Sequence, residues 1–320
     1  MKFSQVVHFI LLVVLFCSAN QILRASETND GSIVERKTYS FPTYEQAVEK
    51  TDVEKYFSKQ QYQKAVADPH FRFEKLKYMS DGLKVVAYLY GPKRRPGKPL
   101  PAIIFNRGGA IRDDIAPELV PFFHDLAVEG FVIVAPMYRQ SDGGEGRDEI
   151  GGADLDDLMN VIPLVKSLGF IDVKDLFMYG ESRGGVMTYQ AIKENFPANA
   201  AAVFGAFTDL YDLIAAHPDV YSQKMLSQFW PNIDTQRDEL IKARSAIYWP
   251  ERLNVPLLIM NGGNDKGVSP THSLKLAEQL QKLGKTYELV IYAEDNHYLS
   301  LNHEDRDGKA LAWFERHRKK

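Results

Sequence analysis

The sequence predicts an α/β fold, in which helices flank a mostly parallel sheet. From residue 101 onward, short apolar runs of strand length alternate with longer helix-compatible segments, which is the order of βαβ units. One such run, residues 176–179, leads directly into Gly180-Glu181-Ser182-Arg183-Gly184 and then into a helix-compatible stretch. With 320 residues, of which 45% are hydrophobic, the chain can bury a large core. We therefore expect one α/β domain of about 250 residues with short additions.

Residues 1–25 have the features of a secretory signal peptide. A basic start is followed by an apolar stretch, residues 6–16, and then by small residues. This stretch is shorter than the about 20 apolar residues that a membrane-spanning helix needs. Cleavage is expected after Ala19 or after Ala25. Cys17, the only cysteine, follows a bulky residue and does not fit a lipoprotein anchor. We therefore expect a periplasmic or secreted protein with no stable membrane anchor after processing.

Residues 26–70 are predicted to form an N-terminal helical arm. The segment begins with a polar stretch, and residues 42–67 then show helical spacing of apolar side chains. Two interpretations are open: an amphipathic arm packed on the body of the protein, or a lid or dimerisation arm at the mouth of the site. Residues 71–90 follow as two antiparallel strands joined around Asp81-Gly82, which is a hairpin signal.

The remaining elements are predicted by the alternation of apolar and helical segments. Strands are expected at 101–105, 131–135, 176–179, 201–204, 255–260 and 287–292, and helices at 116–129, 154–168, 186–195, 271–283 and from 303 onward. The Gly- and charge-rich loop 141–152 is either a surface excursion or part of the leaving-group side of the site. The insertion 208–251 carries interleaved aromatic residues, and it forms either a cap over the site or a helical excursion that buries its own aromatics.

The segment 180–184 fits G-x-S-x-G, the nucleophile elbow, in which a serine lies on a sharp turn between a buried strand and a helix. Gly180 and Gly184 would let the strand and the helix approach closely beside a strained Ser182. A serine that merely begins a helix would also give this pattern. That interpretation does not require an acid and a histidine later in the chain, whereas this chain has a candidate acid and a candidate histidine after Ser182.

A serine hydroxyl needs a general base that is itself oriented by a carboxylate. In this fold the acid follows the serine along the chain, and the histidine comes last. Asp265 lies in a loop just after the apolar strand 255–260, where catalytic groups collect in open α/β sheets. Asp209 and Asp212, which follow the preceding strand, are the alternative acids.

The predicted base is His297, in a polar loop directly after the last strand. His303 is the alternative, but it is expected to begin the final helix. The site also needs hydrogen-bond donors for the oxyanion that forms during attack. One donor is expected to be the backbone N–H of Arg183, and another comes from the loop around Gly108. This Gly-Gly loop lacks both the dinucleotide fingerprint and the P-loop lysine, so nucleotide binding is not expected.

From residue 71 to the C-terminus, the chain resembles the catalytic domain of the prolyl-oligopeptidase family within the α/β-hydrolase superfamily. The resemblance rests on Ser80-Asp81-Gly82-Leu83, Asn106-Arg107-Gly108-Gly109, Gly151-Gly152-Ala153-Asp154-Leu155-Asp156-Asp157, the elbow extended by Gly185, and the Asp265 and His297 loops. It implies an α/β-hydrolase fold with a mostly parallel, eight-stranded sheet. The small helical insertion 208–251, expected from the residues themselves, would follow the sixth strand. The resemblance also implies the triad Ser182, His297 and Asp265 in a catalytic domain spanning 71–320.

Two departures from the family pattern are relevant to function. Family peptidases usually carry a β-propeller before the catalytic domain, for which these 320 residues have no room. Some members use a tyrosine hydroxyl in the oxyanion hole, where this loop offers Arg107. In addition, Glu181 before the serine recurs in carboxylesterases, which favours ester substrates.

The sequence therefore predicts an exported serine hydrolase that works through an acyl-enzyme and needs no metal or other cofactor. The resemblance favours a peptidase acting on short peptides. The alternative is a carboxylesterase acting on small or carbohydrate-linked acyl esters. A hypothesis of another class is a non-catalytic binding protein that kept the hydrolase fold. A net charge of −3 and a pI near 6.3 give no indication of nucleic-acid binding.

Overall fold

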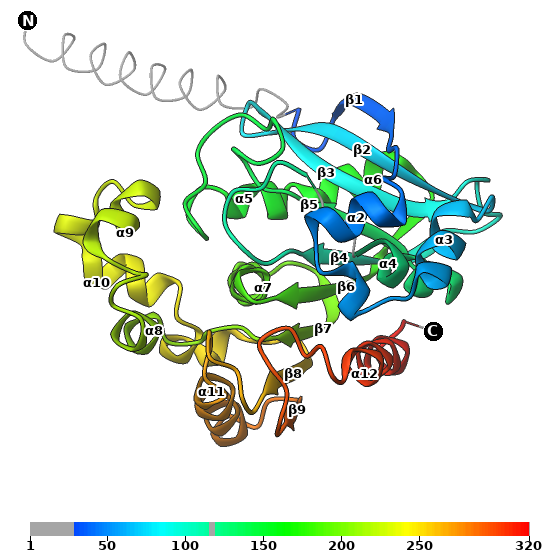
Figure 1. Cartoon of the computed structure of the whole chain (residues 1–320). Helices are drawn as coiled ribbons and strands as arrows, with labels where there is room; N and C mark the ends of the chain where they lie inside the picture. Colours follow the sequence, from blue (N-terminus) through cyan, green and yellow to red (C-terminus); the bar gives the residue numbers. More distant parts are fainter. Residues whose placement is uncertain (1–28, 115–118, 320) are drawn as a thin grey trace, which may run out of the picture.

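The computed structural model describes residues 29–114 and 119–319, and the expected signal peptide lies outside these residues. The described part contains one nine-stranded sheet in the order β1-β2-β3-β5-β4-β6-β7-β8-β9 (Figure 1). The pairs β1–β2, β2–β3 and β3–β5 are antiparallel. The other five pairs, β5–β4, β4–β6, β6–β7, β7–β8 and β8–β9, are parallel. The strands are β1 (Ile33–Thr38), β2 (Phe71–Ser80), β3 (Leu83–Pro92), β4 (Leu100–Asn106), β5 (Val132–Pro136), β6 (Ile171–Glu181), β7 (Ala198–Phe204), β8 (Leu257–Gly262) and β9 (Tyr287–Tyr292). The α/β-hydrolase fold expected from the sequence is confirmed.

The sheet has one strand more than the eight that the resemblance implies. The additional strand is β1, which pairs antiparallel with β2 at the edge of the sheet. It lies at the start of the segment expected to form the arm. Its cross-strand contacts are largely ionic, since Arg36 Nε donates to Glu74 at 2.9 Å. A short, charged edge strand has no alternating apolar pattern, so hydrophobic periodicity could not identify it.

Two layers of helices cover the sheet. Helices α5 (Leu155–Met159), α6 (Val161–Leu168), α7 (Arg183–Lys193) and α11 (Thr271–Lys282) pack on one face. Helices α2 (Tyr44–Lys50), α3 (Lys59–Ala67), α4 (Leu119–Val128) and α12 (His303–Arg316) pack on the other. Each layer has its own hydrophobic core against the central strands, and these cores hold the carboxyl ends of the strands in place. In the described residues, no helix has the length and apolar character to cross a membrane.

The arm is interrupted rather than continuous. Helices α2 and α3 each begin with a capping box, made by Thr43 with Gln46 and by Ser58 with Gln61, and the short helix η1 (Val53–Lys55) lies between them. The arm buries side chains such as Ala47 and Tyr62 in the same core as α4. It therefore packs on the body of the protein, as the first interpretation has it.

The segment after β7 forms α8 (Leu210–Ala216), α9 (Gln223–Phe229), α10 (Ile233–Ala243) and the short helices η2 (Ala246–Tyr248) and η3 (Pro250–Arg252). These helices share a small core of their own that includes Trp230 and Ile233. Trp230 Nε1 also donates to the carbonyl oxygen of Glu149 at 2.5 Å. The insertion is thus a helical excursion with a small core of its own, and it is attached to the loop 141–152. Of its aromatic side chains, Trp230 is buried in that core, whereas Tyr248 is exposed.

Candidate active site

Ser182 lies on the sharp turn between β6 and α7. Its φ of 51° and ψ of −119° fall where residues with a side chain are rarely found, so the surrounding structure must hold it there. The Ser182 N–H donates to the carbonyl oxygen of Phe204 at 2.8 Å, which ties the turn to β7. The elbow predicted from the sequence therefore has the strained strand–turn–helix geometry that exposes a serine hydroxyl.

Gly184 allows α7 to approach the loop after β4. A Cβ at this position would lie 1.8 Å from the carbonyl oxygen of Asn106, which is a backbone atom that cannot move independently. We expect Gly184→Ala to lower the free energy of unfolding by about 1–3 kcal/mol, because the helix must move away from the loop. Urea unfolding monitored by circular dichroism measures this loss.

Gly308→Ala in α12 is the matched control, since no atom lies within 4 Å of its added Cβ. We expect it to be stabilising by up to about 1 kcal/mol, because alanine favours a helix more than glycine. Equal effects of the two substitutions would contradict the role of Gly184.

The structure brings together the three residues predicted to form the triad. His297 Nε2 lies 2.9 Å from Ser182 Oγ, and His297 Nδ1 lies 2.7 Å from Asp265 Oδ2. The other Asp265 oxygen accepts the backbone N–H groups of Gly267 and Val268, each at 2.8 Å. The carboxylate is fully buried and fixed from both sides, so it can hold one orientation of the imidazole.

The alternative acids and base lie elsewhere. Asp209 caps the N-terminus of α8, and Asp212 forms an ion pair with Lys275. His303 begins α12, and its Nδ1 lies 3.1 Å from the carbonyl oxygen of Ser300. In the described residues, none of these three side chains contacts Ser182.

Backbone N–H groups are available for an oxyanion. Arg183 is the first residue of α7, so its N–H has no acceptor within the helix. Gly108 lies in the loop after β4, against the elbow, and an added Cβ there would meet the Glu181 carbonyl oxygen at 3.3 Å. The two groups predicted from the sequence are therefore beside the serine.

The Arg107 side chain has a different position from the one expected for an oxyanion donor. Its Nη1 donates to the carbonyl oxygens of Gly108, Gly109 and Ala110, and its Nη2 donates to Met137 and Ser141. Burial lowers the pKa of Arg107 to about 10, so it remains charged at neutral pH. The guanidinium is occupied in holding the loop, and it can position Gly108 rather than bind the oxyanion itself.

The Arg183 side chain is part of a buried ion-pair cluster that the sequence did not reveal. Its two Nη atoms bond Asp148 at 2.7 Å each, and Nη2 also bonds Asp154 at 2.7 Å. The guanidinium lies 4.8 Å from the centre of the Tyr138 ring. Both carboxylates are fully buried, so the loop 141–152 is anchored at the elbow through Asp148. The only signal was Asp154 within the Gly151–Asp157 motif.

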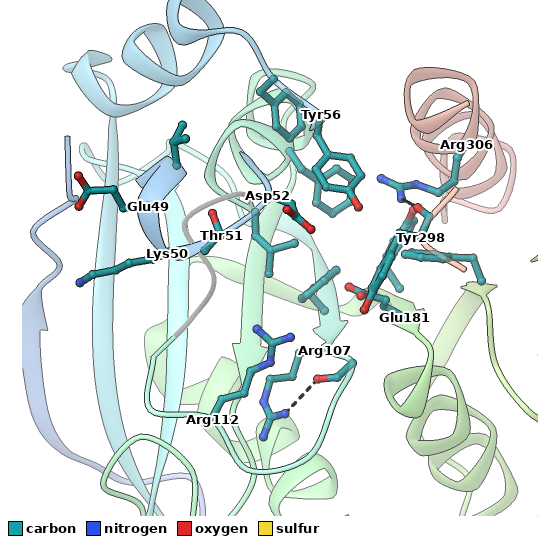
Figure 2. Close-up of a pocket in the computed structure, with 18 residues that line it drawn as sticks. Glu49, Lys50, Thr51, Asp52, Tyr56, Arg107, Arg112, Glu181, Tyr298 and Arg306 are labelled. Atoms are coloured by element: carbon teal, nitrogen blue, oxygen red, sulfur yellow. Dashed lines mark hydrogen bonds between the residues drawn. The ribbon is translucent and has the colours of Figure 1, made fainter. Parts of the chain in front are cut away.

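A cavity of about 540 Å³ is lined by the residue before Ser182 and the residue after His297, and Figure 2 draws the side chains around it. One wall of the cavity is formed by the body of the protein. It includes Gly108 of the loop after β4, Glu181, which precedes Ser182, and Tyr298, which follows His297. The other wall is formed by the arm, from Val48 to Phe57. The arm thus lines the cavity as well as packing on the body. Among the described residues, no group of three or more His, Cys, Asp or Glu side chains is arranged to hold a metal ion.

Comparison with known proteins places this geometry in a family. A sequence model of the prolyl oligopeptidase family matches residues 123–320, which include Ser182, Asp265 and His297. The chain belongs to the prolyl oligopeptidase family. The match begins within α4, so the arm and strands β1 to β4 lie outside it. Membership makes the chain a hydrolase of the serine-peptidase type.

The chain is also similar to individual known proteins. The chain is 28% identical to the uncharacterized peptidase YtmA of Bacillus subtilis over 231 residues, which cover 72% of this chain and 87% of YtmA. The acylaminoacyl peptidase of Pyrococcus horikoshii has a TM-score of 0.63 at 20% identity, covering 78% of this chain and 42% of that one. A puromycin-hydrolyzing peptidase of Mycobacterium tuberculosis has a TM-score of 0.64 at 23% identity, covering 74% and 38%. This prolyl-oligopeptidase-family chain thus spans less than half the length of the two solved structures, whose likeness shows the fold.

Proposed function

We propose that the protein is an exported serine peptidase that cleaves short peptides through an acyl-enzyme on Ser182. The observation that carries this proposal is the continuous hydrogen-bonded chain from Ser182 Oγ through His297 to the buried Asp265 carboxylate. Family membership supports peptide substrates over other acyl compounds. The signal-peptide features of residues 1–25 support export to the periplasm or the medium.

The geometry allows a two-step hydrolysis. His297 Nε2 takes the proton of Ser182 Oγ as this oxygen attacks the substrate carbonyl carbon. The N–H groups of Arg183 and Gly108 stabilise the oxyanion of the tetrahedral intermediate. His297 then gives the proton to the leaving amine, and the acyl-enzyme remains. Water attacks this ester with His297 again acting as base, which releases the acid and restores Ser182. Asp265 keeps the imidazole tautomer that both steps need.

The arm gives a physical basis for preferring short substrates. Its residues form one wall of the cavity that Gly108 and Glu181 also line, so a substrate that extends from Ser182 into this cavity would contact the arm. A long or folded polypeptide would have to displace α2 and η1, which are packed into the core. Short peptides can enter without that displacement.

A carboxylesterase acting on small or carbohydrate-linked acyl esters is the second candidate. Glu181 favours it, because a glutamate at this position of the elbow also occurs in carboxylesterases. The experiment that separates the two compares a p-nitrophenyl acyl ester with a chromogenic prolyl-peptide amide, using the mature protein. We expect amide cleavage that disappears in Ser182→Ala. Turnover of the ester without any amide cleavage would instead support the esterase, because esters are intrinsically easier to cleave.

A further inference from the structure

Glu181 is a charged residue in the cavity that the triad mechanism does not use. It directly precedes Ser182, and its Oε1 lies 3.2 Å from the point that a Cβ on Gly108 would occupy. The carboxyl group is therefore close to the loop that would hold the oxyanion. Within the described residues it accepts no hydrogen bond, and burial raises the pKa of Glu181. A buried carboxylate with no hydrogen-bonded partner is costly to the fold.

The basic side chains of the cavity form no bond with this carboxylate, although the charges of Arg306 and Arg112 lower the pKa of Glu181 and so partly offset its burial. Arg306 forms two bonds with Asp307, at 2.7 and 2.9 Å, and donates to the carbonyl oxygen of Tyr298 at 2.8 Å. The Arg107 guanidinium is occupied by the carbonyls of its loop. Arg112 is exposed, so water screens its charge, and it forms no ion pair in the described part of the chain.

Two tyrosine hydroxyls lie near this carboxylate. Figure 2 shows Tyr298 next to Glu181, with Tyr56 of the arm turned toward both. Neither hydroxyl has a hydrogen-bond partner among the described residues. The pKa of each tyrosine is raised, first by burial and then by the charge of Glu181. A tyrosine presents an oxygen that can accept a hydrogen bond and a ring face that attracts a cation.

We propose that Glu181, Tyr56 and Tyr298 form a subsite for an ammonium group of the substrate, beside the bond that is cleaved. This subsite rests on the proposed function. An ammonium group offers three donors to one carboxylate and two hydroxyl oxygens. It also neutralises a negative charge that would otherwise oppose the oxyanion developing nearby, because charges separated by a few ångströms interact strongly in a partly buried site.

The ammonium group has two possible sources in a peptide. One is the free α-amino group of the residue whose carbonyl is attacked, which would make the protein an aminopeptidase. The other is the side chain of a lysine that follows the cleaved bond. A cavity of about 540 Å³ has room for either. The two sources share the same chemistry, and a substrate panel distinguishes them.

The experiment measures kcat/KM for alanine p-nitroanilide and for its N-acetyl form, which differ in the positive charge. A second pair consists of N-acetylated peptides with lysine or methionine after the cleaved bond. We expect the wild type to prefer the charged member of one pair by at least tenfold. In Glu181→Gln this preference falls by at least tenfold, mainly through KM. In Arg112→Gln it does not fall, because that substitution leaves the subsite carboxylate in place.

Two results would overturn the subsite: a preference for the uncharged member of both pairs, or an equal loss on charged and uncharged substrates in Glu181→Gln. A fluorophosphonate probe keeps the test independent of turnover. Alaninamide or lysinamide should slow labelling of the wild type more than N-acetylalaninamide does, and Glu181→Gln should remove that difference. Absence of the difference in the wild type also overturns the subsite. Failure of the probe to label Ser182 at all would instead overturn the proposed function.

Discussion

Ser182→Ala is expected to lower kcat by about 10⁴- to 10⁶-fold while leaving the fold intact. The substitution removes only Oγ, whose hydrogen bond in the structure is the one to His297 Nε2 at 2.9 Å. The strained backbone at this position is held by its neighbours, including the Ser182 N–H bond to Phe204. Steady-state turnover of the best peptide or ester substrate, together with the circular dichroism spectrum, measures both parts of this prediction.

Ser300→Ala is a suitable control, because Ser300 lies in the loop after His297 and its hydroxyl accepts from Asn296 rather than from the triad. Its kcat should stay within a few-fold of the wild type. If Ser182→Ala retained most of the activity, another nucleophile would have to be responsible, and the assignment of Ser182 would be wrong.

Arg183→Met is expected to lower the free energy of unfolding by about 3–5 kcal/mol. The substitution leaves Asp148 and Asp154, both fully buried, without the cation that compensates them. Burial alone would lower the pKa of Arg183. The charges of the two carboxylates outweigh that effect and raise the pKa, so the fold favours the charged form of Arg183. Urea unfolding at neutral pH measures the loss.

Arg112→Met is the matched control for stability. Arg112 is exposed, so its substitution should change the free energy of unfolding by no more than about 0.5 kcal/mol. A similar small change for Arg183→Met would mean that the buried cluster does not contribute to stability. A second variant, Asp154→Asn, keeps Arg183 paired with Asp148 and should therefore lose less than Arg183→Met.

The proposed triad could be predicted because its signals are local. The elbow follows from glycine spacing around Ser182, and Asp265 and His297 each follow directly after an apolar strand. Parallel strands bring their carboxyl ends to one edge of the sheet, so three short segments were sufficient to name three side chains. The sheet pairs and the hydrogen bonds at 2.7 and 2.9 Å agree with that prediction.

The supporting interactions could not be predicted because they join distant parts of the chain. Arg183 meets Asp148 and Asp154 across 35 and 29 residues. The side chain of Arg107 donates to the backbone carbonyl oxygens of Ala110 and Met137, and a sequence pattern cannot predict which backbone atoms a side chain will contact. The arm has an ordinary amphipathic pattern, and only its packing shows that it also lines the cavity. Charged edge strands such as β1 carry no apolar alternation for a sequence pattern to detect.

The most direct test of the account is covalent labelling of the folded protein with a fluorophosphonate, followed by mass mapping of the modified peptide. We predict one adduct, on Ser182, which forms slowly or not at all in His297→Ala because that variant lacks the base that activates the hydroxyl. An adduct on another residue, or no adduct on a correctly folded protein, would contradict the claim that Ser182, His297 and Asp265 form a working catalytic triad.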